Sequence, residues 1–131
     1  MDQETQIVMA RVEKLGEMSE AEELRIVNEI YSDGIVSRNE AETLFRLNEM
    51  LSATDANWAS RFQEAVADFL LTREAPEGWV TEEEGEWLVA QVQMDAEKPS
   101  VTELDMFLAV LRKAEGAPVD LAQYVMNAIA N

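Results

Sequence analysis

Residues 58–71 read WASRFQEAVADFLL, and the apolar side chains of this stretch return every three or four positions. That spacing puts them on one face of a helix, as one continuous stripe that a core can bury. No segment of the chain alternates apolar and polar residues for long in the two-residue period of a strand. We therefore expect an all-α protein, with this stripe in its core: Trp58, Phe62, Ala65, Val66, Phe69 and Leu70.

Helix starts are marked by hydroxyl residues that are followed three positions later by glutamate. In such a capping box the hydroxyl accepts from an unpaired backbone amide and the glutamate reaches back to the cap amide. Four pairs fit, namely Ser19/Glu22, Ser37/Glu40, Thr81/Glu84 and Ser100/Glu103. With glycines and prolines at the expected ends, we expect a single compact bundle of about seven helices near 3–16, 20–32, 38–52, 55–73, 82–95, 101–115 and 118–130.

Two segments, residues 33–42 and 77–86, carry nearly the same pattern 44 positions apart. Each has an acid and a glycine, then an apolar pair, then a hydroxyl residue with a glutamate three positions later. The match extends upstream and downstream, where Ile26-Val27 aligns with Leu70-Leu71 and Leu44 aligns with Leu88. We expect residues 1–131 to form a single all-helical domain with two similar helix-turn-helix units, at about 20–52 and 55–95, and Val36 to meet Val80 in a short bridge.

The composition excludes several kinds of chemistry. The 131 residues include no cysteine and no histidine, so disulfides, thiolate metal sites and Ser-His-Asp or Cys-His catalysis are absent. Carboxylates are the acid and base groups that remain, and no glycine-rich phosphate loop or dinucleotide fingerprint occurs. We expect a protein that is not an enzyme and needs no cofactor, with a carboxylate-based enzyme as the less favoured alternative.

The chain has 27 acidic and 10 basic residues, a formal net charge of −17. This field repels phosphate backbones and anionic lipids, so we expect neither nucleic-acid nor membrane binding. It favours a protein partner with a basic surface. Trp79, which falls inside the second turn, is the candidate anchor for such a partner, although most tryptophans of this kind lie in the core. The methionines could line an adaptable groove, although filling the core is their commoner use. The N-terminus has no signal-peptide pattern, which predicts a cytoplasmic protein of bacterial type.

The repeated turn resembles the second half of an EF-hand loop, with glycine at position 6, an apolar residue at position 8 and glutamate at position 12. The resemblance implies metal ligands at Glu29, Asp33 and Glu40 in the first copy, and weaker ones at Glu77 and Glu84 in the second. Both copies lack a carboxylate at position 3, and the second has Arg73 at position 1. The second copy is therefore not expected to bind calcium as an EF-hand does, and weak binding of Ca²⁺ or Mg²⁺ is the expectation for the first copy.

The segment Asp33-Gly34-Ile35-Val36-Ser37-x-x-Glu40 also resembles the acid-Gly-x-hydrophobic-Ser-x-x-Glu signature of tellurite-resistance (TerB-like) helical domains. The resemblance covers mainly residues 24–51, with a fainter copy at 68–92. It implies a compact helical bundle whose acidic residues can bind a divalent cation and which takes part in stress-response or envelope-associated complexes. The second copy departs from the signature, because Glu77 replaces the aspartate.

A structural explanation of the repeat needs no ligand. Glycine accepts the positive φ of a tight turn, the apolar pair closes the end of the bundle, and Ser-x-x-Glu caps the next helix. The leading hypothesis is then a non-enzymatic acidic interaction domain of bacterial type. The alternative is a weak Ca²⁺ or Mg²⁺ binding protein that uses the degenerate acidic turn.

Overall fold

The computed structural model describes residues 3–35, 37–54, 57–94 and 98–130, and within them the side chains of 31, 33, 49 and 52–54 are left undescribed. These ranges are all-helical and contain no strand, as expected. The helices are α1 (Gln3–Leu15), α2 (Glu20–Asp33), α3 (Arg38–Thr54), α4 (Trp58–Asp68), the π-helix η1 (Phe69–Arg73), α5 (Glu82–Gln93), α6 (Val101–Lys113) and α7 (Val119–Ala130).

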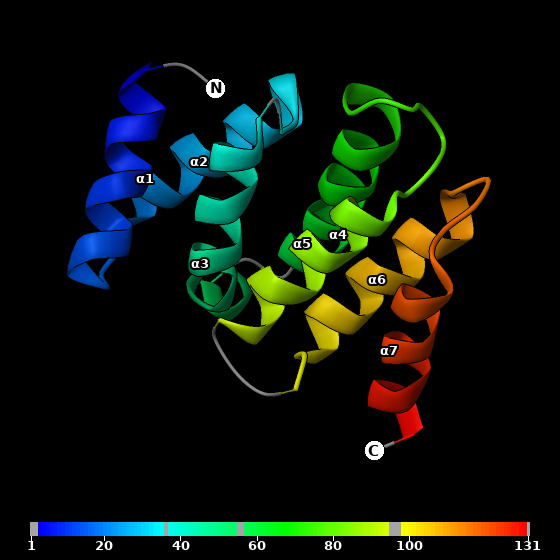
Figure 1. Ribbon diagram of the computed structural model, residues 1–131. Coiled ribbons are helices and arrows are strands. Elements are labelled where there is room, and N and C mark those ends of the chain that lie inside the picture. Colours follow the sequence, from blue (N-terminus) through cyan, green and yellow to red (C-terminus); the bar gives the residue numbers. More distant parts are fainter. Residues whose placement is uncertain (1–2, 36, 55–56, 95–97, 131) are drawn as a thin grey trace.

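The helices pack around one core, with α1 to α3 on one side of the molecule and α6 and α7 on the other (Figure 1). The most extensive contact joins α4 to α6. Helix α1 packs on α2 and α3, while α7 packs on α5 and α6. Helix α4 also contacts α2 and α3, so it connects the two sides of the bundle.

The predicted helix starts are confirmed by their capping contacts. Ser19, Thr81 and Ser100 each form a complete capping box with the glutamate three residues later. At the start of α3, the Glu40 backbone N–H donates to Ser37 Oγ over 3.3 Å. All seven expected helices form, with the one expected at 55–73 divided into α4 and η1. The expected bounds at residues 55 and 95 lie outside the described residues, and the others agree to within one turn.

The apolar stripe of α4 forms the aromatic centre of the core, as expected. Trp58 and Phe62 are buried, and the Phe62 ring meets the edge of Phe45 with centroids 5.2 Å apart. The Trp58 Nε1 donates to the buried Asn48 Oδ1 over 2.8 Å. The one polar atom of the indole is therefore satisfied inside the core, which removes the cost of burying it.

The helix predicted through residue 73 changes its winding after Asp68. Phe69, Leu70 and Leu71 are all buried, although an α-helix turns about 100° per residue and would spread three successive side chains around its axis. The π-helical turn is wider, and its Glu74 N–H donates to the Phe69 carbonyl oxygen over 3.2 Å. Local widening of the helix thus accompanies the burial of three consecutive apolar residues.

The two copies of the repeated pattern match in burial and in the positive φ of their glycines. Gly34 and Gly78 have φ values of +68° and +81°, in the region that favours glycine. The aligned pairs Ile26/Leu70, Val27/Leu71, Glu40/Glu84, Ala41/Gly85 and Leu44/Leu88 are buried in both copies. The copies differ at Ile35 and Trp79, which are 1% and 49% exposed. The chain before the glycine also differs, because α2 runs up to Gly34 whereas η1 ends at Arg73 and the Gly78 N–H donates to the Leu71 carbonyl over 2.8 Å. The repeat therefore has the same role after the glycine, where it starts α3 and α5, but not before it.

The second turn pairs with the segment that precedes α7, which the sequence did not indicate. The Val80 N–H donates to the Gly116 carbonyl over 2.9 Å, and the Glu115 N–H donates to the Gly78 carbonyl over 2.6 Å. Val36, the expected partner of Val80, lies outside the described residues, and the backbone N–H of Val80 is used by Gly116. The Trp79 ring covers Gly116 so closely that a Cβ there would lie 2.1 Å from the ring.

Gly85 offers the first test of this packing, because glycine inside a helix costs about 1 kcal/mol relative to alanine. The expected close neighbour is present, since an added Cβ would lie 3.5 Å from both Leu121 and Pro118. That distance is ordinary contact. We expect Gly85→Ala to raise the free energy of unfolding by about 0.5–1 kcal/mol in urea titrations followed by circular dichroism.

Gly116→Ala is the matched comparison for this glycine-to-alanine change. Its Cβ would displace the Trp79 ring, so we expect a loss of about 1–2 kcal/mol and a change in tryptophan fluorescence. A loss of stability in Gly85→Ala would show that α5 and α7 approach more tightly than described here.

Candidate functional site

The first set of predicted metal ligands does not lie on a loop. Glu29 and Asp33 belong to the last turns of α2, whose backbone is helical through Asp33. The Asp33 side chain lies outside the described residues. Glu40 is buried near the start of α3, where Gln6 Nε2 donates to its Oε2 over 3.4 Å. Within the part of the chain that the structure describes, no three acidic side chains group as a metal site.

The second set is divided between solvent and the core. Glu77 is exposed, whereas Glu84 is 2% exposed. The Thr81 N–H donates to Glu84 Oε1 over 2.8 Å, so this oxygen serves the capping box of α5. Glu84 therefore has a structural partner in the position where the EF-hand pattern has its bidentate ligand.

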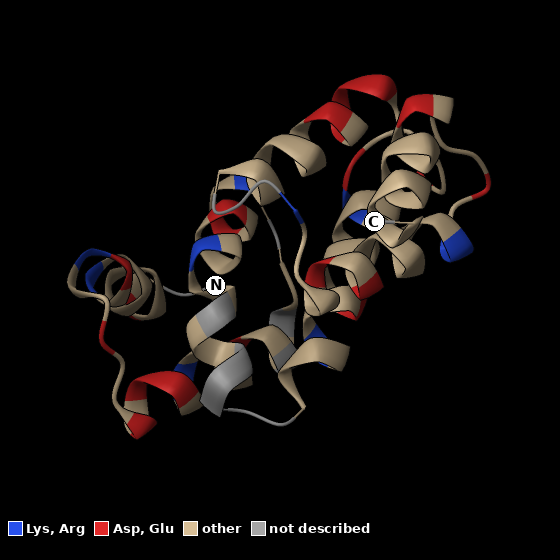
Figure 2. Cartoon of the chain, turned by 90° about the horizontal axis from the view of Figure 1, so that it is seen from below, with Lys and Arg blue, Asp and Glu red and all other residues tan. Residues whose placement is uncertain are grey.

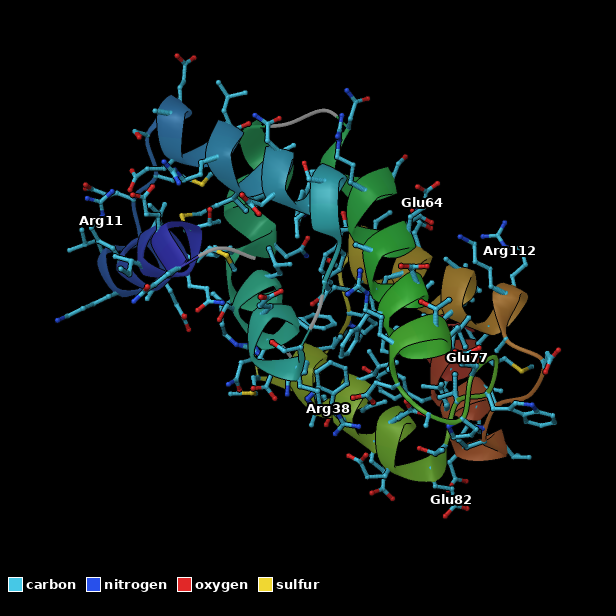
Figure 3. The ribbon with its side chains drawn as sticks, turned by 90° about the horizontal axis from the view of Figure 1, so that it is seen from above. Arg11, Arg38, Glu64, Glu77, Glu82 and Arg112 are labelled. Carbon is cyan, nitrogen blue, oxygen red and sulfur yellow. The ribbon has the colours of Figure 1, made fainter. Side chains whose placement is uncertain are left out.

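The structure instead brings together a charged cluster around Arg38, which sequence reasoning missed. Arg38 lies at the start of α3 and faces the segment that leads to α5 (Figure 3). Its Nε and Nη2 donate to the two oxygens of Glu74 over 2.9 and 2.8 Å. Its Nη1 and Nη2 donate to the two oxygens of Glu83, each over 2.6 Å. One guanidinium thus holds two carboxylates, each through two hydrogen bonds.

An aromatic ring and further hydrogen bonds extend this cluster. The Arg38 guanidinium carbon lies 5.1 Å from the centroid of the Trp87 ring, within the range of a cation–π contact. Trp87 Nε1 donates to Glu42 Oε2 over 2.8 Å. Arg46 Nη2 donates to Gln91 Oε1 over 2.6 Å one turn further along. Helix α3 is therefore joined to α5 by polar contacts along its length.

The cluster shifts the ionisation of its members in opposite directions. Hydrogen bonds to Glu83 and then Glu74 raise the pKa of Arg38, and the same guanidinium lowers the pKa of both carboxyls. Burial, followed by the neighbouring Glu74 carboxylate, raises the pKa of Glu84. Glu84 Oε2 is buried without a hydrogen-bond partner. A proton on this oxygen would allow it to donate to Glu74, which adds to the effect of burial in raising the pKa of Glu84.

Removal of the Arg38 guanidinium tests how much the cluster contributes to stability by joining the two repeated units. We expect Arg38→Met to lower the free energy of unfolding by about 1–2 kcal/mol, because Glu74 is left partly buried without its cation. Arg38→Lys should restore only part of the loss, since an ammonium cannot form both two-pronged pairs. Urea unfolding measures the stability of both variants, and Arg112→Met, at an exposed position of α6, is the control (Figure 3). Equal losses in Arg38→Met and Arg112→Met would contradict a structural role for the cluster.

Glu84 predicts a dependence of stability on pH. Because its folded pKa lies above the unfolded one, the proton's contribution is fully present below the unfolded pKa, about 4.3, and is lost as pH rises through the folded pKa. Glu84→Gln keeps an oxygen for the Thr81 N–H and mimics the protonated acid. We expect this variant to be more stable than the parent by about 1 kcal/mol at pH 7.

The advantage of Glu84→Gln should vanish near pH 4, where the parent carries the proton itself. Thermal unfolding between pH 4 and pH 8 measures the difference. An unchanged difference across that range would mean that folding does not shift the pKa of Glu84.

A groove of about 280 Å³ lies between α5 and α7. Its floor is apolar and includes the buried Gly85 and Leu121 together with the half-buried Val89 and Tyr124. Three acidic residues line it and are exposed, and no Lys or Arg is among the lining residues. These acids are Glu82, Glu86 and Asp120. The groove therefore combines an apolar floor with a negatively charged edge.

Tyr124 has an unusual position in this groove. Its ring packs on Phe107 with centroids 5.6 Å apart, while its hydroxyl is buried without a hydrogen-bond partner. Burial and the nearby Glu103 carboxylate raise the pKa of this phenol. The neutral hydroxyl is thus a donor that has no acceptor within the described chain.

The hollow between α2, α4, η1 and α6 is larger but polar, with a volume of about 490 Å³. It contains both signs of charge, since Arg61, Arg73 and Lys113 line it together with Glu64 and Asp68. Such a mixture selects no simple ion. The α5–α7 groove is the better candidate site because its charges have one sign.

Trp79 and the methionines, which the sequence suggested as partner contacts, do not lie together in the structure. Trp79 is half-exposed, as a partner anchor requires, with its ring packed on Gly116. Methionine does not line the α5–α7 groove. Met9 and Met106 are buried in the core. Met94 and Met126 are exposed, and neither is among the residues that line the groove. A methionine-lined groove is therefore wrong for this site, since the apolar floor is made of smaller aliphatic residues and one tyrosine.

Comparison with protein-family models, curated proteins and solved structures found no match for this chain. Among the described residues, no helix has both the length and the apolar character needed to cross a membrane.

Proposed function

We propose that this chain is a non-enzymatic interaction domain that binds a basic segment of a partner protein. The main observation behind this proposal is the excess of acidic residues on a well-packed helical domain. Even if every Lys and Arg paired with one acid, 17 acids would remain. Opposite charge on a partner would speed association and select against acidic competitors.

The distribution of charge supports this proposal. Acidic positions recur along several helices and connections, while basic positions are fewer (Figure 2). The first turn of α5 alone holds Glu82, Glu83 and Glu84. Trp79 is also exposed, and the half-buried Val89 and Tyr124 lie in the groove that Glu82, Glu86 and Asp120 line. Negative charge next to exposed apolar surface is the combination that an amphipathic basic segment recognises.

The buried carboxylates support a non-enzymatic role. An acid with a shifted pKa in a cleft is the usual carboxylate catalyst. Here the buried acids Glu40, Glu84 and Glu103 each sit three residues after a capping hydroxyl residue at a helix start. Helix capping accounts for their burial without a reaction. Among the described residues, no group of three acidic side chains supports the alternative role in Ca²⁺ or Mg²⁺ binding.

Selection from a random peptide display library tests the proposed function. We expect the enriched peptides to share a positive net charge and apolar residues spaced three or four positions apart, since both features match this surface. Their binding should weaken steeply between 50 and 300 mM salt. Enrichment of neutral or acidic peptides, or no enrichment, would contradict the proposal.

A further inference from the structure

We propose that the α5–α7 groove is the docking site, and that its occupant is a short amphipathic helix of a partner protein with basic residues beside its apolar anchors. This inference rests on the proposed function and specifies where and how the basic segment binds. It follows from the size of the groove, from its floor and from the sign of its edge.

The dimensions of the groove fit side chains from a helix. Its volume of about 280 Å³ falls just below the range of pockets that enclose cofactors or drug-sized ligands. The lining residues of α5 run from Glu82 to Gln93, which spans about 16 Å at 1.5 Å per residue. A partner helix of about three turns would cover that length and could insert anchors at positions i, i+3 or i+4, and i+7.

The floor supplies apolar area. Gly85 has no side chain, so the backbone of α5 comes close to Leu121 at this point of the floor. Val89 and Tyr124 are half-buried and would become covered when an apolar anchor enters.

The edge of the groove selects a basic occupant over a second copy of this chain. Glu82, Glu86 and Asp120 are exposed at the edge, and cationic residues are missing from the lining. Two copies that met here would bring these acids together, with a net charge of −17 on each molecule. Like charges brought together in this way oppose association, whereas Lys or Arg on a partner would neutralise the edge.

A second apolar surface provides the internal comparison. Val119, Met126 and Ile129 on α7 are 77, 68 and 56% exposed, and the groove lining does not include them. Within α7 the only charged residue is Asp120. This outer face of α7 offers apolar area without an acidic edge, so it has no preference for a basic helix.

The probe is a fluorescein-labelled 14-residue helix of leucine and lysine with leucines on one face, measured by anisotropy. Ala90→Phe fills the groove from an exposed position, and Glu82→Lys reverses one edge charge. We expect each to weaken binding at least about tenfold. The matched controls are Ala21→Phe, at an exposed position of α2, and Glu64→Lys on α4. Glu64 lies far from Glu82 (Figure 3). Both should change the dissociation constant by less than about twofold.

The possible results distinguish a wrong docking site from a wrong function. Chemical-shift changes in the amides of Gly85, Val89 and Leu121, together with weakening only in the groove variants, would support the groove. Equal weakening in the controls, or shift changes confined to the outer face of α7, would overturn it while leaving a basic-segment-binding function intact. No binding at low salt would contradict the function itself. A peptide with the same composition in scrambled order should bind more weakly, and equal affinity would overturn helical docking.

Discussion

The pairing of one guanidinium with two carboxylates is the constraint on which the arrangement of the two repeated units depends. Arg38 belongs to the first unit, and both Glu74 and Glu83 belong to the second. Because the guanidinium is planar, two-pronged pairs fix direction as well as distance. The start of α3 therefore sets the position of the start of α5. Few exposed ion pairs contribute much stability, but this one also lies against Trp87 and beside a buried acid.

The groove depends on that position, because α5 forms one of its walls. On one side α5 is held by α3 through Arg38, Glu42 and Gln91. At its N-terminal end, the turn before α5 pairs with the segment before α7 through Val80 and Gly116. Both walls are therefore fixed by contacts outside the groove itself. An apolar floor that is held open in this way loses little conformational entropy when a ligand binds.

The sequence predicted local structure far better than it predicted the site. Capping pairs and apolar spacing depend on residues within a turn of each other, so Ser19, Thr81 and Ser100 located their helices. The π-helical turn was missed because periodicity alone does not show a change of winding. The Arg38 pairs join residues 36 and 45 positions apart, and no local pattern marks them. The groove was missed for the same reason, since its walls meet only in the folded chain. Glu84 was identified for its position in the repeat, but its burial and pKa depend on tertiary packing.

The parallel pairing of the second turn with Gly116 has a consequence for biosynthesis. Chains emerge from the ribosome N-terminus first, and the segments made earliest can fold first. Helix α5 is translated before residues 115–116 and before α7, so one wall of the groove exists while the other has yet to be made. During that interval the floor around Gly85 is open to solvent, with Leu121 still to arrive. A partner that requires both walls therefore distinguishes the completed fold from the nascent chain.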